Sequence, residues 1–538
     1  MSGSIKETEC LVIGTGIAGS ICALVAARQG VRVTLLTKRS DPFITNTNLA
    51  QGGIAYRGEN DSPELFKKDI IRAGRGINSI EAVEFLVENG PAIVEELLIK
   101  GLHVEFTPLR RAEVEGFDFA QEGAHSVKRI LHSADCTGKV IEKALIAALE
   151  RQENVEVITG ATCIDLITLQ HHSKDIQARY VLKDRCLGAY VFMEEKREVD
   201  VILAQYTVLA TGGLGDIYLH TTNEKGTVGD GIVMAKRAGA RILNMEFVQF
   251  HPTSLYLPGK RRFLISEAVR GEGARLKNLS GEYFMDKYNP QFKDLAPRDE
   301  VTAAIWMEMI KNKEEYVLLD VANHVNGNVQ ERFPTIFRTC KDAGIDITRE
   351  PIPVVPAAHF LCGGIHVDTR GRTTLEGLYA VGEVSCTGLH GANRLASTSL
   401  LEGLTWGCFA AKDIAERIHS GETVKEKTMR SIREWIPAGE LENEDPALIA
   451  QDWMVIKHTM WNYVGIVRSS QRLKRAIRDL RHMYSRVEDF YKETAVSKDI
   501  ISLFHGLQSA ILVAEAAQRN RRSIGCHRLS NSFTQIKI

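Results

Sequence analysis

The chain has 538 residues, and its 67 Lys or Arg against 68 Asp or Glu give a formal net charge of −1. With 44% apolar and 25% charged residues, it has the composition of a folded globular protein, which excludes a disordered chain and a fibrous repeat. Near-neutral charge without a sustained basic run argues against nucleic-acid binding, so small-molecule chemistry is expected.

The ten cysteines are scattered, and none forms the Cys-x-x-Cys pair of a zinc or redox site. They predict reduced, mostly buried thiols and no metal. The apolar N-terminal stretch is broken by Arg28, Arg32 and several glycines, and Glu7 and Glu9 precede it. Neither a membrane span nor a signal peptide is therefore expected, and the sequence indicates a cytoplasmic protein without a membrane partner.

The first predicted elements are a strand over residues 9–13, a helix over 20–29 and a second strand over 31–36. A G-x-G-x-x-G turn lies between the first strand and the helix. In this context the turn predicts a dinucleotide site, because free N–H groups at the helix N-terminus face the phosphates. The turn consists of Gly14, Thr15, Gly16, Ile17, Ala18 and Gly19.

The three glycines have separate roles in such a turn. Gly14 permits the tight turn, Gly16 lets the backbone approach a pyrophosphate, and Gly19 lets the helix pack on the strand. After the second strand, where an acid often holds the ribose, the chain has Thr37 and Lys38. The turn alone therefore leaves NAD, NADP and FAD open.

Two later segments favour FAD. Residues 206–213 read as a buried strand that ends in a glycine turn, and residues 377–383 as another strand that ends in Gly382 and Glu383. With the N-terminal turn they look like the three separated pieces of an FAD-binding Rossmann domain, in which the last acid binds the ribityl side of the flavin. A simple NAD domain does not need the third piece.

Seven further segments occur in the order typical of one family. They are residues 46–53, 229–231, 245–253, 266–273, 297–299, 359–365 and 391–400. With these segments the chain resembles the succinate dehydrogenase/fumarate reductase flavoprotein family from about Cys10 to Gly407.

This resemblance implies an α/β fold built on an FAD-binding Rossmann-type domain. Motif positions place that domain at residues 1–250 and 355–420, with an inserted α+β capping domain at 251–354. Helical periodicity between residues 447 and 518 predicts a C-terminal helical bundle, assigned to residues 421–538.

Two positions separate the branches of the family. Members of membrane complexes carry a histidine bonded covalently to the flavin five positions before Gln51, whereas this chain has Asn46, so non-covalent FAD is predicted. Residues 121–132 resemble the E-G-G-H-S-x-x-R-I-L-H stretch of members that oxidise L-aspartate, with Ala124 in place of the second glycine. Glu122 would repel a dicarboxylate unless the substrate also carries a positive group such as an α-ammonium.

The resemblance also implies roles for the substrate site. His251, His359 and Arg394 would bind the carboxylates, Ser266 stands where the family has Thr or Ser, and Arg298 would transfer the proton. A guanidinium suits a carboxylate, but it is a poor base at neutral pH, so an electrostatic clamp remains the alternative for Arg298. The predicted catalytic residues are Arg298, His251, His359, Arg394, Glu122, Ser266 and Arg270.

Other polar residues have plainer interpretations. We expect His125 and His132 to be structural and Lys128 and Arg129 to be charges on a helix surface. For His527, support of the flavin domain is the only role suggested. The predicted FAD contacts are residues 14–19, Lys38, Asn46, Thr47, Asn48, Leu49, Ala50, Gln51, Gly52, Gly53, Asp230, Glu383, Ser399 and Leu400.

The implied activity is FAD-dependent oxidation of L-aspartate to iminosuccinate, with dioxygen or fumarate as the electron acceptor. Iminosuccinate is unstable in water, and in the family it feeds quinolinate synthase at the start of NAD biosynthesis. One alternative is a soluble fumarate reductase or succinate dehydrogenase-type flavoprotein, against which stand Glu122 and the lack of a haem Cys-x-x-Cys-His segment. The other is a subunit that assembles with iron–sulfur or membrane partners, against which stands Asn46.

Overall fold

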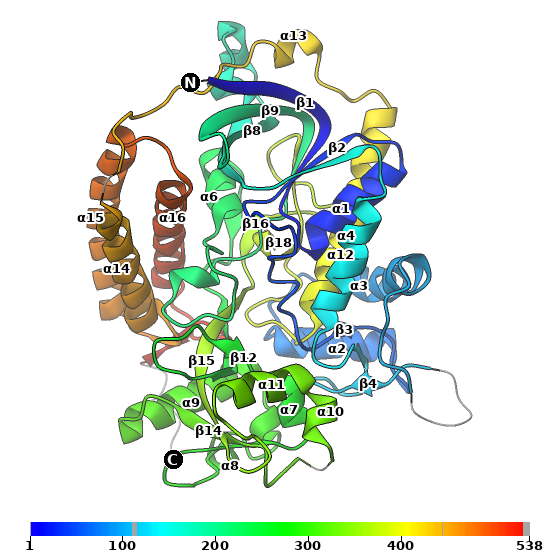
Figure 1. The fold of residues 1–538 in the computed structure, drawn as a ribbon, viewed down its shortest axis with the longest axis vertical. Coiled ribbons are helices and arrows are strands. Elements are labelled where there is room, and N and C mark those ends of the chain that lie inside the picture. The colour runs from blue at the N-terminus through cyan, green and yellow to red at the C-terminus, as the bar shows by residue number, and fades with distance from the viewer. Residues whose placement is uncertain (1, 110–115, 326, 444, 531–538) are drawn as a thin grey trace.

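The protein consists of a sheet domain, a second sheet inserted into it and a group of long C-terminal helices (Figure 1). These are described from a computed structural model. The structure describes residues 2–109, 116–325, 327–443 and 445–530.

The first domain is built on a seven-stranded sheet in the order β6-β2-β1-β9-β8-β7, with β17 also paired to β9. Strands β6, β2, β1, β9 and β17 pair in parallel, and β7 and β8 extend the sheet in antiparallel fashion. Residues Cys10 to Ile13 are buried, as the continuous apolar run of a parallel strand covered on both faces requires. The strands are β1 (Ser2–Ile13), β2 (Val33–Leu36), β6 (Val155–Ile158), β7 (Ala161–Thr168), β8 (Cys186–Met193), β9 (Glu198–Leu209) and β17 (Leu378–Ala380).

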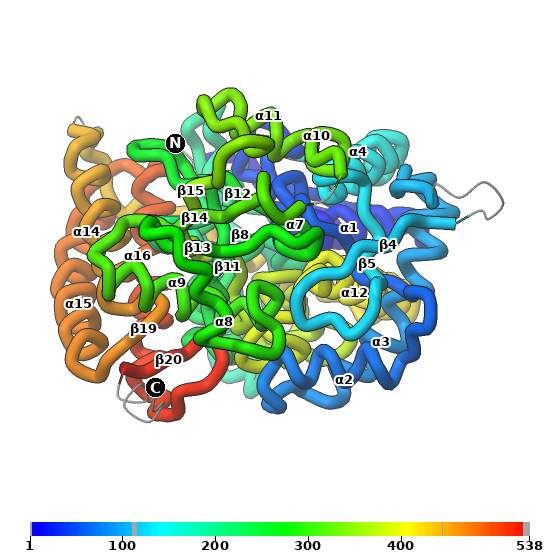
Figure 2. Tube along the Cα trace, turned by 90° about the horizontal axis from the view of Figure 1, so that it is seen from below, coloured from blue at the N-terminus to red at the C-terminus, as the bar shows by residue number. Residues whose placement is uncertain are grey.

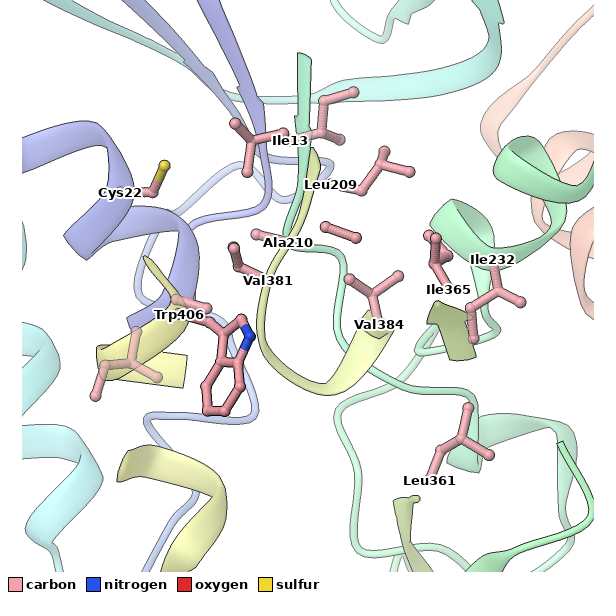
Figure 3. Close-up of a cluster of buried hydrophobic side chains, with 14 of the residues drawn as sticks. Ile13, Cys22, Leu209, Ala210, Ile232, Leu361, Ile365, Val381, Val384 and Trp406 are labelled. Atoms are coloured by element: carbon pink, nitrogen blue, oxygen red, sulfur yellow. The ribbon is translucent and has the colours of Figure 1, made fainter. Parts of the chain in front are cut away.

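Helix α1 (Ile17–Arg28), which is buried from Ile17 to Ala27, packs on this sheet, and α12 (Thr398–His419) and α4 (Thr137–Leu149) pack on α1. Figure 3 shows how the core joins segments distant in sequence: Ile13, Leu209, Val381 and Trp406 belong to one cluster, in which Val381 lies nearest to Trp406. The three pieces proposed from the sequence for FAD binding therefore lie at the carboxyl ends of three paired strands of one sheet, β1, β9 and β17.

The inserted part has its own apolar core and an antiparallel sheet in the order β12-β11-β15-β14-β13. Both predicted limits of the capping domain fall inside strands, β11 and β15, that continue toward the first domain. Both strands belong to the inserted sheet and pair with each other, so the predicted limits cut through this sheet. The elements are β11 (Val248–Leu255), β12 (Phe263–Leu264), α7 (Glu267–Gly271), β13 (Arg275–Lys277), α8 (Met285–Tyr288), α9 (Arg298–Asn312), β14 (Val317–Asp320), α10 (Val329–Arg332), α11 (Pro334–Asp342) and β15 (Ile352–Leu361).

Three long helices, α14 (Pro446–Val464), α15 (Ser470–Glu493) and α16 (Lys498–Arg519), lie together along one side of the molecule (Figures 1 and 2). Among the described residues, α16 is the one helix long and apolar enough to cross a membrane by length and composition, a stretch that the sequence expectation overlooked. Its apolar window is 61% buried, and α16 packs on α15, α14 and α6 (Asp230–Arg237). Packing in the core explains its composition.

The remaining elements are short or peripheral. The other helices are α2 (Pro63–Ala73), α3 (Ile80–Ile93), α5 (Leu169–His172) and α13 (Glu426–Met429), and the π-helical turn Val94–Gly101 continues α3. The other strands are β3 (Ile54–Ala55), β4 (Phe119–Ala120), β5 (Ile130–Leu131), β10 (Ile242–Leu243), β16 (Gly364–His366), β18 (Ser385–Cys386), β19 (Val467–Arg468) and β20 (Arg528–Leu529).

Candidate active site

A cavity of about 1130 Å³ runs between the first sheet and the inserted sheet. It is large enough for a dinucleotide cofactor with a small substrate beside it. Of the predicted site residues, Gly19 and Arg270 alone do not line it. The predicted residues that do are Gly14, Thr15, Gly16, Ile17, Ala18, Lys38, Asn46, Thr47, Asn48, Leu49, Ala50, Gln51, Gly52, Gly53, Glu122, Asp230, His251, Ser266, Arg298, His359, Glu383, Arg394, Ser399 and Leu400.

The glycine turn at one end of the cavity fits the pyrophosphate of FAD. Gly14 has φ +117°, and a Cβ there would lie 2.2 Å from the carbonyl oxygen of Ala210. A Cβ on Gly19 would lie 1.9 Å from the oxygen of Gly14. Helix α1 has no side-chain cap at Gly16 and no acid in its first turn, so its positive N-terminal end suits an anionic ligand.

Lys38 follows β2, where dinucleotide folds often have an acid. Its ammonium forms a salt bridge of 2.5 Å with Asp230, which also lies 3.0 Å from Nδ1 of His505 on α16. Burial alone would raise the pKa of the Asp230 carboxyl, but Lys38 and His505 outweigh it and lower that pKa. The C-terminal helices thus help to order the cofactor end of the cavity.

The loop over residues 46–53 is fixed by side-chain contacts with its surroundings. Oδ1 of Asn46 accepts from the backbone N–H of Glu224 at 2.7 Å, and Oγ1 of Thr47 accepts from the N–H of Ile17 at 3.0 Å. Because an amide at Asn46 offers no nucleophile, the loop suits a flavin held without a covalent bond.

Glu383 is half-buried and lines the cavity, and its Oε1 accepts from the N–H of Leu361 at 2.9 Å. Burial raises the pKa of this carboxyl to about 7, against the opposing effects of the Leu361 N–H and Arg394. A Cβ on Gly213 would lie 2.1 Å from Oε1, so the glycine turn after β9 makes room for it.

Two histidines face each other at the other end of the cavity, with ring centroids 5.1 Å apart. Nδ1 of His359 bonds to Oγ1 of Thr222 at 2.7 Å, and Nδ1 of His251 bonds to the backbone of Thr253. Burial, together with nearby arginines, lowers the pKa of both imidazoles well below the usual value, so both rings are neutral. Within the described residues no hydrogen bond involves Nε2 of either ring, which leaves both for a ligand.

Gln249 holds the two arginines of the site together. Its Oε1 accepts from Nη1 of Arg298 at 3.2 Å and from Nε of Arg394 at 3.3 Å. Arg394 also donates to Oγ of Ser399 at 2.6 Å and lies 4.5 Å over the ring of Phe360. Burial lowers the pKa of Arg394 to about 10, and Arg298 adds to that effect, so the group remains a cation at neutral pH.

Behind Arg298 lies Glu267, whose Oε2 accepts from Nε of Arg298 at 2.5 Å. Burial would raise the pKa of Glu267, but Arg298 and Arg270 outweigh it and lower that pKa. Arg270 is fully buried, 3.7 Å from Glu267 and away from the cavity. Arg270 therefore contacts Glu267 and does not face the cavity. Ser266 caps α7 by accepting from the N–H of Ala268 at 3.3 Å.

Glu122 lies inside the cavity with 4% of its surface exposed, and its Oε2 accepts from Oγ of Ser397 at 2.5 Å. Burial and Glu267 raise the pKa of Glu122, against the opposing effects of Arg298, Ser397 and Arg394. The site therefore has two guanidinium groups and a separate carboxyl that faces the same space.

The segment around Glu122 also corrects one expectation. Arg129 is fully buried rather than on a helix surface, and it forms salt bridges of 2.8 Å with Asp61 and Asp69. Nε2 of His125 bonds to the oxygen of Ala396 at 3.0 Å.

Two further histidines, His132 and His527, do not line the cavity. His132 lies 3.3 Å from Asp118 and bonds to Arg332 of the inserted part at 3.2 Å. His527 bonds to Arg468 at 2.8 Å. Within the described residues no group of three or more His, Cys, Asp or Glu could hold a metal ion.

Three residues of the site were not singled out in the sequence: Gln249, Glu267 and Ser397. Each lies within a segment that carries the family resemblance, one or two positions from a residue that was named. Their signal was present, but polar residue type alone did not say which side chain would face the cavity.

Comparisons with known proteins show the class of protein to which the chain belongs. A family model described as an FAD binding domain matches residues 9–400. A mutant of E. coli quinol fumarate reductase has a similar structure, with a TM-score of 0.86 at 26% identity over 98% of this chain and 92% of the other. Mycobacterium smegmatis Sdh1 is also similar, with a TM-score of 0.79 at 27% identity over 98% of this chain and 90% of the other. The fold and cavity thus define an FAD-binding flavoprotein of the fumarate reductase type.

More similar sequences narrow this class. The L-aspartate oxidase of Pseudomonas aeruginosa is 41% identical over 97% of this chain and 95% of its own length. That of Halobacterium salinarum is 41% identical over 97% and 96%. This chain belongs to the L-aspartate oxidase family. The predicted family, α/β fold class and FAD cofactor are thereby confirmed.

Proposed function

We propose that this chain oxidises L-aspartate to iminosuccinate and passes the electrons to dioxygen or fumarate. The observation that carries the proposal is the pairing of Arg298 and Arg394 with a separate buried carboxyl, Glu122, in one cavity. L-aspartate carries two carboxylates and one ammonium, so it matches both signs of charge. A plain dicarboxylate would leave Glu122 facing negative charge.

The residues of the chain bind and orient the substrate. Arg394, with the neutral rings of His251 and His359, is suited to the carboxylates, and Glu122 to the ammonium. Bound FAD would supply the two-electron oxidation of the Cα–N bond. The positive charge of Arg298 would hold the substrate. In fumarate reduction Arg298 would donate a proton, and Glu267, which is bonded to Nε of Arg298, could return a proton to it.

The proposed product implies a second enzyme that consumes it, and the cysteines indicate a cellular compartment. Iminosuccinate is unstable in water, so an enzyme that consumes it promptly is required, and quinolinate synthase is the partner that the family resemblance implies. We place the reaction in the cytoplasm, and the ten cysteines, all free thiols, suit a reducing compartment.

Soluble fumarate reduction is the second candidate, supported by the likeness to fumarate reductase structures. Anaerobic mixing of the FAD-loaded protein with L-aspartate separates the two. We expect loss of the oxidised flavin absorbance with L-aspartate and none with succinate at the same concentration. Bleaching by succinate alone would transfer the assignment to the fumarate reductase type.

A further inference from the structure

Ser397, the residue before α12, has an unusual backbone conformation. Its φ is +56° and its ψ 12°, in the left-handed region that residues with a Cβ seldom adopt. A serine at a helix N-cap normally accepts from an N–H of the first turn, but the side chain of Ser397 makes no such bond. Its hydroxyl is committed to another partner.

That partner is Glu122, to whose Oε2 the hydroxyl donates at 2.5 Å across 275 residues of chain. Both side chains lie over the backbone of Gly52. A Cβ at Gly52 would lie 2.5 Å from Oε1 of Glu122 and 3.4 Å from Oγ of Ser397. The pair therefore requires both the glycine below it and the left-handed turn at Ser397.

Within the described residues this is the one hydrogen bond recorded for the side chain of Glu122, so Oε1 has no protein partner there. The charged groups that act on Glu122 come from three elements: Glu267 of α7, Arg298 of α9 and Arg394 of the loop before α12. Burial and Glu267 raise the pKa of Glu122 above its usual value, and the two arginines and the Ser397 hydroxyl limit that rise. A hydroxyl donor stabilises the ionised form because the bond is stronger to a charged oxygen.

We propose that Ser397 is a positioning residue for substrate specificity, because its hydroxyl fixes Oε2 of Glu122 and leaves Oε1 free for the substrate ammonium. The inference rests on the proposed function and deepens it. Without this bond Glu122 would be more often protonated and free to rotate, and the advantage of an amino dicarboxylate over a plain dicarboxylate would decrease.

The test compares Ser397→Ala and Ser397→Gly with the wild-type protein, all loaded with FAD. Both variants remove the donor, but glycine also removes the backbone strain, so an effect of the hydroxyl is the same in both. Thr398→Val is the matched control, because the Thr398 hydroxyl at the same helix start donates to the oxygen of Leu395 instead.

Steady-state kinetics of L-aspartate oxidation and fumarate reduction are then measured across pH. We expect both Ser397 variants to raise KM for L-aspartate about tenfold with a smaller change in kcat, because each variant loses a hydrogen bond to a charged group. The acid limb of kcat/KM for L-aspartate should move to higher pH, and fumarate reduction should not weaken. The control should affect both substrates equally and leave the acid limb in place.

An equal effect of Ser397→Ala and Ser397→Gly on both substrates, or an unmoved acid limb, would overturn the role of Ser397. A wild-type protein that reduces fumarate but does not oxidise L-aspartate would instead overturn the proposed function. The two failures are thus distinguishable in one set of measurements.

Discussion

Glu122→Gln removes one negative charge from the cavity with almost no change in shape. The side chain is 4% exposed, so solvent does little to screen its contact with an ammonium. Loss of a hydrogen bond to a charged group costs about 1.5–3 kcal/mol, or roughly 10- to 150-fold in kcat/KM for L-aspartate. The value below about 1 kcal/mol typical of a surface ion pair does not apply at this position.

The same substitution should act in the opposite direction on fumarate. Fumarate has no ammonium, and a neutral amide repels its two carboxylates less than Glu122 does, so its reduction should be unchanged or faster. The variant should also melt no lower than the wild type, because Glu122 and Glu267 disfavour each other's charge.

Steady-state kinetics with both substrates, together with thermal unfolding, checks this prediction. Equal losses for L-aspartate and fumarate in a stably folded variant would refute ammonium recognition by Glu122. Such a result would also remove the main reason for preferring aspartate oxidation over fumarate reduction at this site.

Three more predictions follow from single contacts. Arg394→Lys should weaken apparent affinity for L-aspartate and fumarate at least about tenfold in steady-state kinetics, because lysine cannot keep the bonds to Gln249 and Ser399. Burial raises the pKa of the Glu142 carboxyl to about 8, so the contribution of Glu142 to stability is complete below its usual pKa and is lost as pH rises toward 8. In thermal unfolding across that range, Glu142→Gln should therefore become increasingly more stable than the wild type. The difference in the free energy of unfolding should grow by at most about 1.4 kcal/mol per pH unit. Ala124 has φ +67°, and Ala124→Gly should raise the melting temperature through up to about 1 kcal/mol of relieved strain.

Elements set by local pattern could be predicted from the sequence. The strand expected over residues 9–13 lies within β1, and the helix and second strand after it correspond to α1 and β2. The glycine turn is equally local, since Gly14 and Gly19 are required by the backbone atoms beside them. The predicted roles of individual site residues, and the domain limits, stay predictions.

What could not be predicted depends on tertiary contacts. Arg129 was expected on a surface, but Asp61 and Asp69, 60 or more residues away, give it a buried partner on each side. The bond from Ser397 to Glu122 likewise joins two segments 275 residues apart. Residue type indicated polar groups in these segments, but only the fold decides which of them meet.

Gln249 places a neutral amide between the two arginines, and this affects how the site binds a substrate carboxylate. If Gln249 were a carboxylate, it would neutralise Arg298 and Arg394 from within the protein and compete with the substrate for them. As an amide it fixes both guanidiniums, while its Nε2 is occupied by Asn393 and the oxygen of Arg394. The carboxylates of the site are kept apart from this bridge: Glu267 lies at Nε of Arg298, and Glu122 is held by Ser397. Within the described residues Arg394 therefore forms no salt bridge, which leaves its charge for a substrate carboxylate, and Glu122 offers a separate carboxyl to an ammonium.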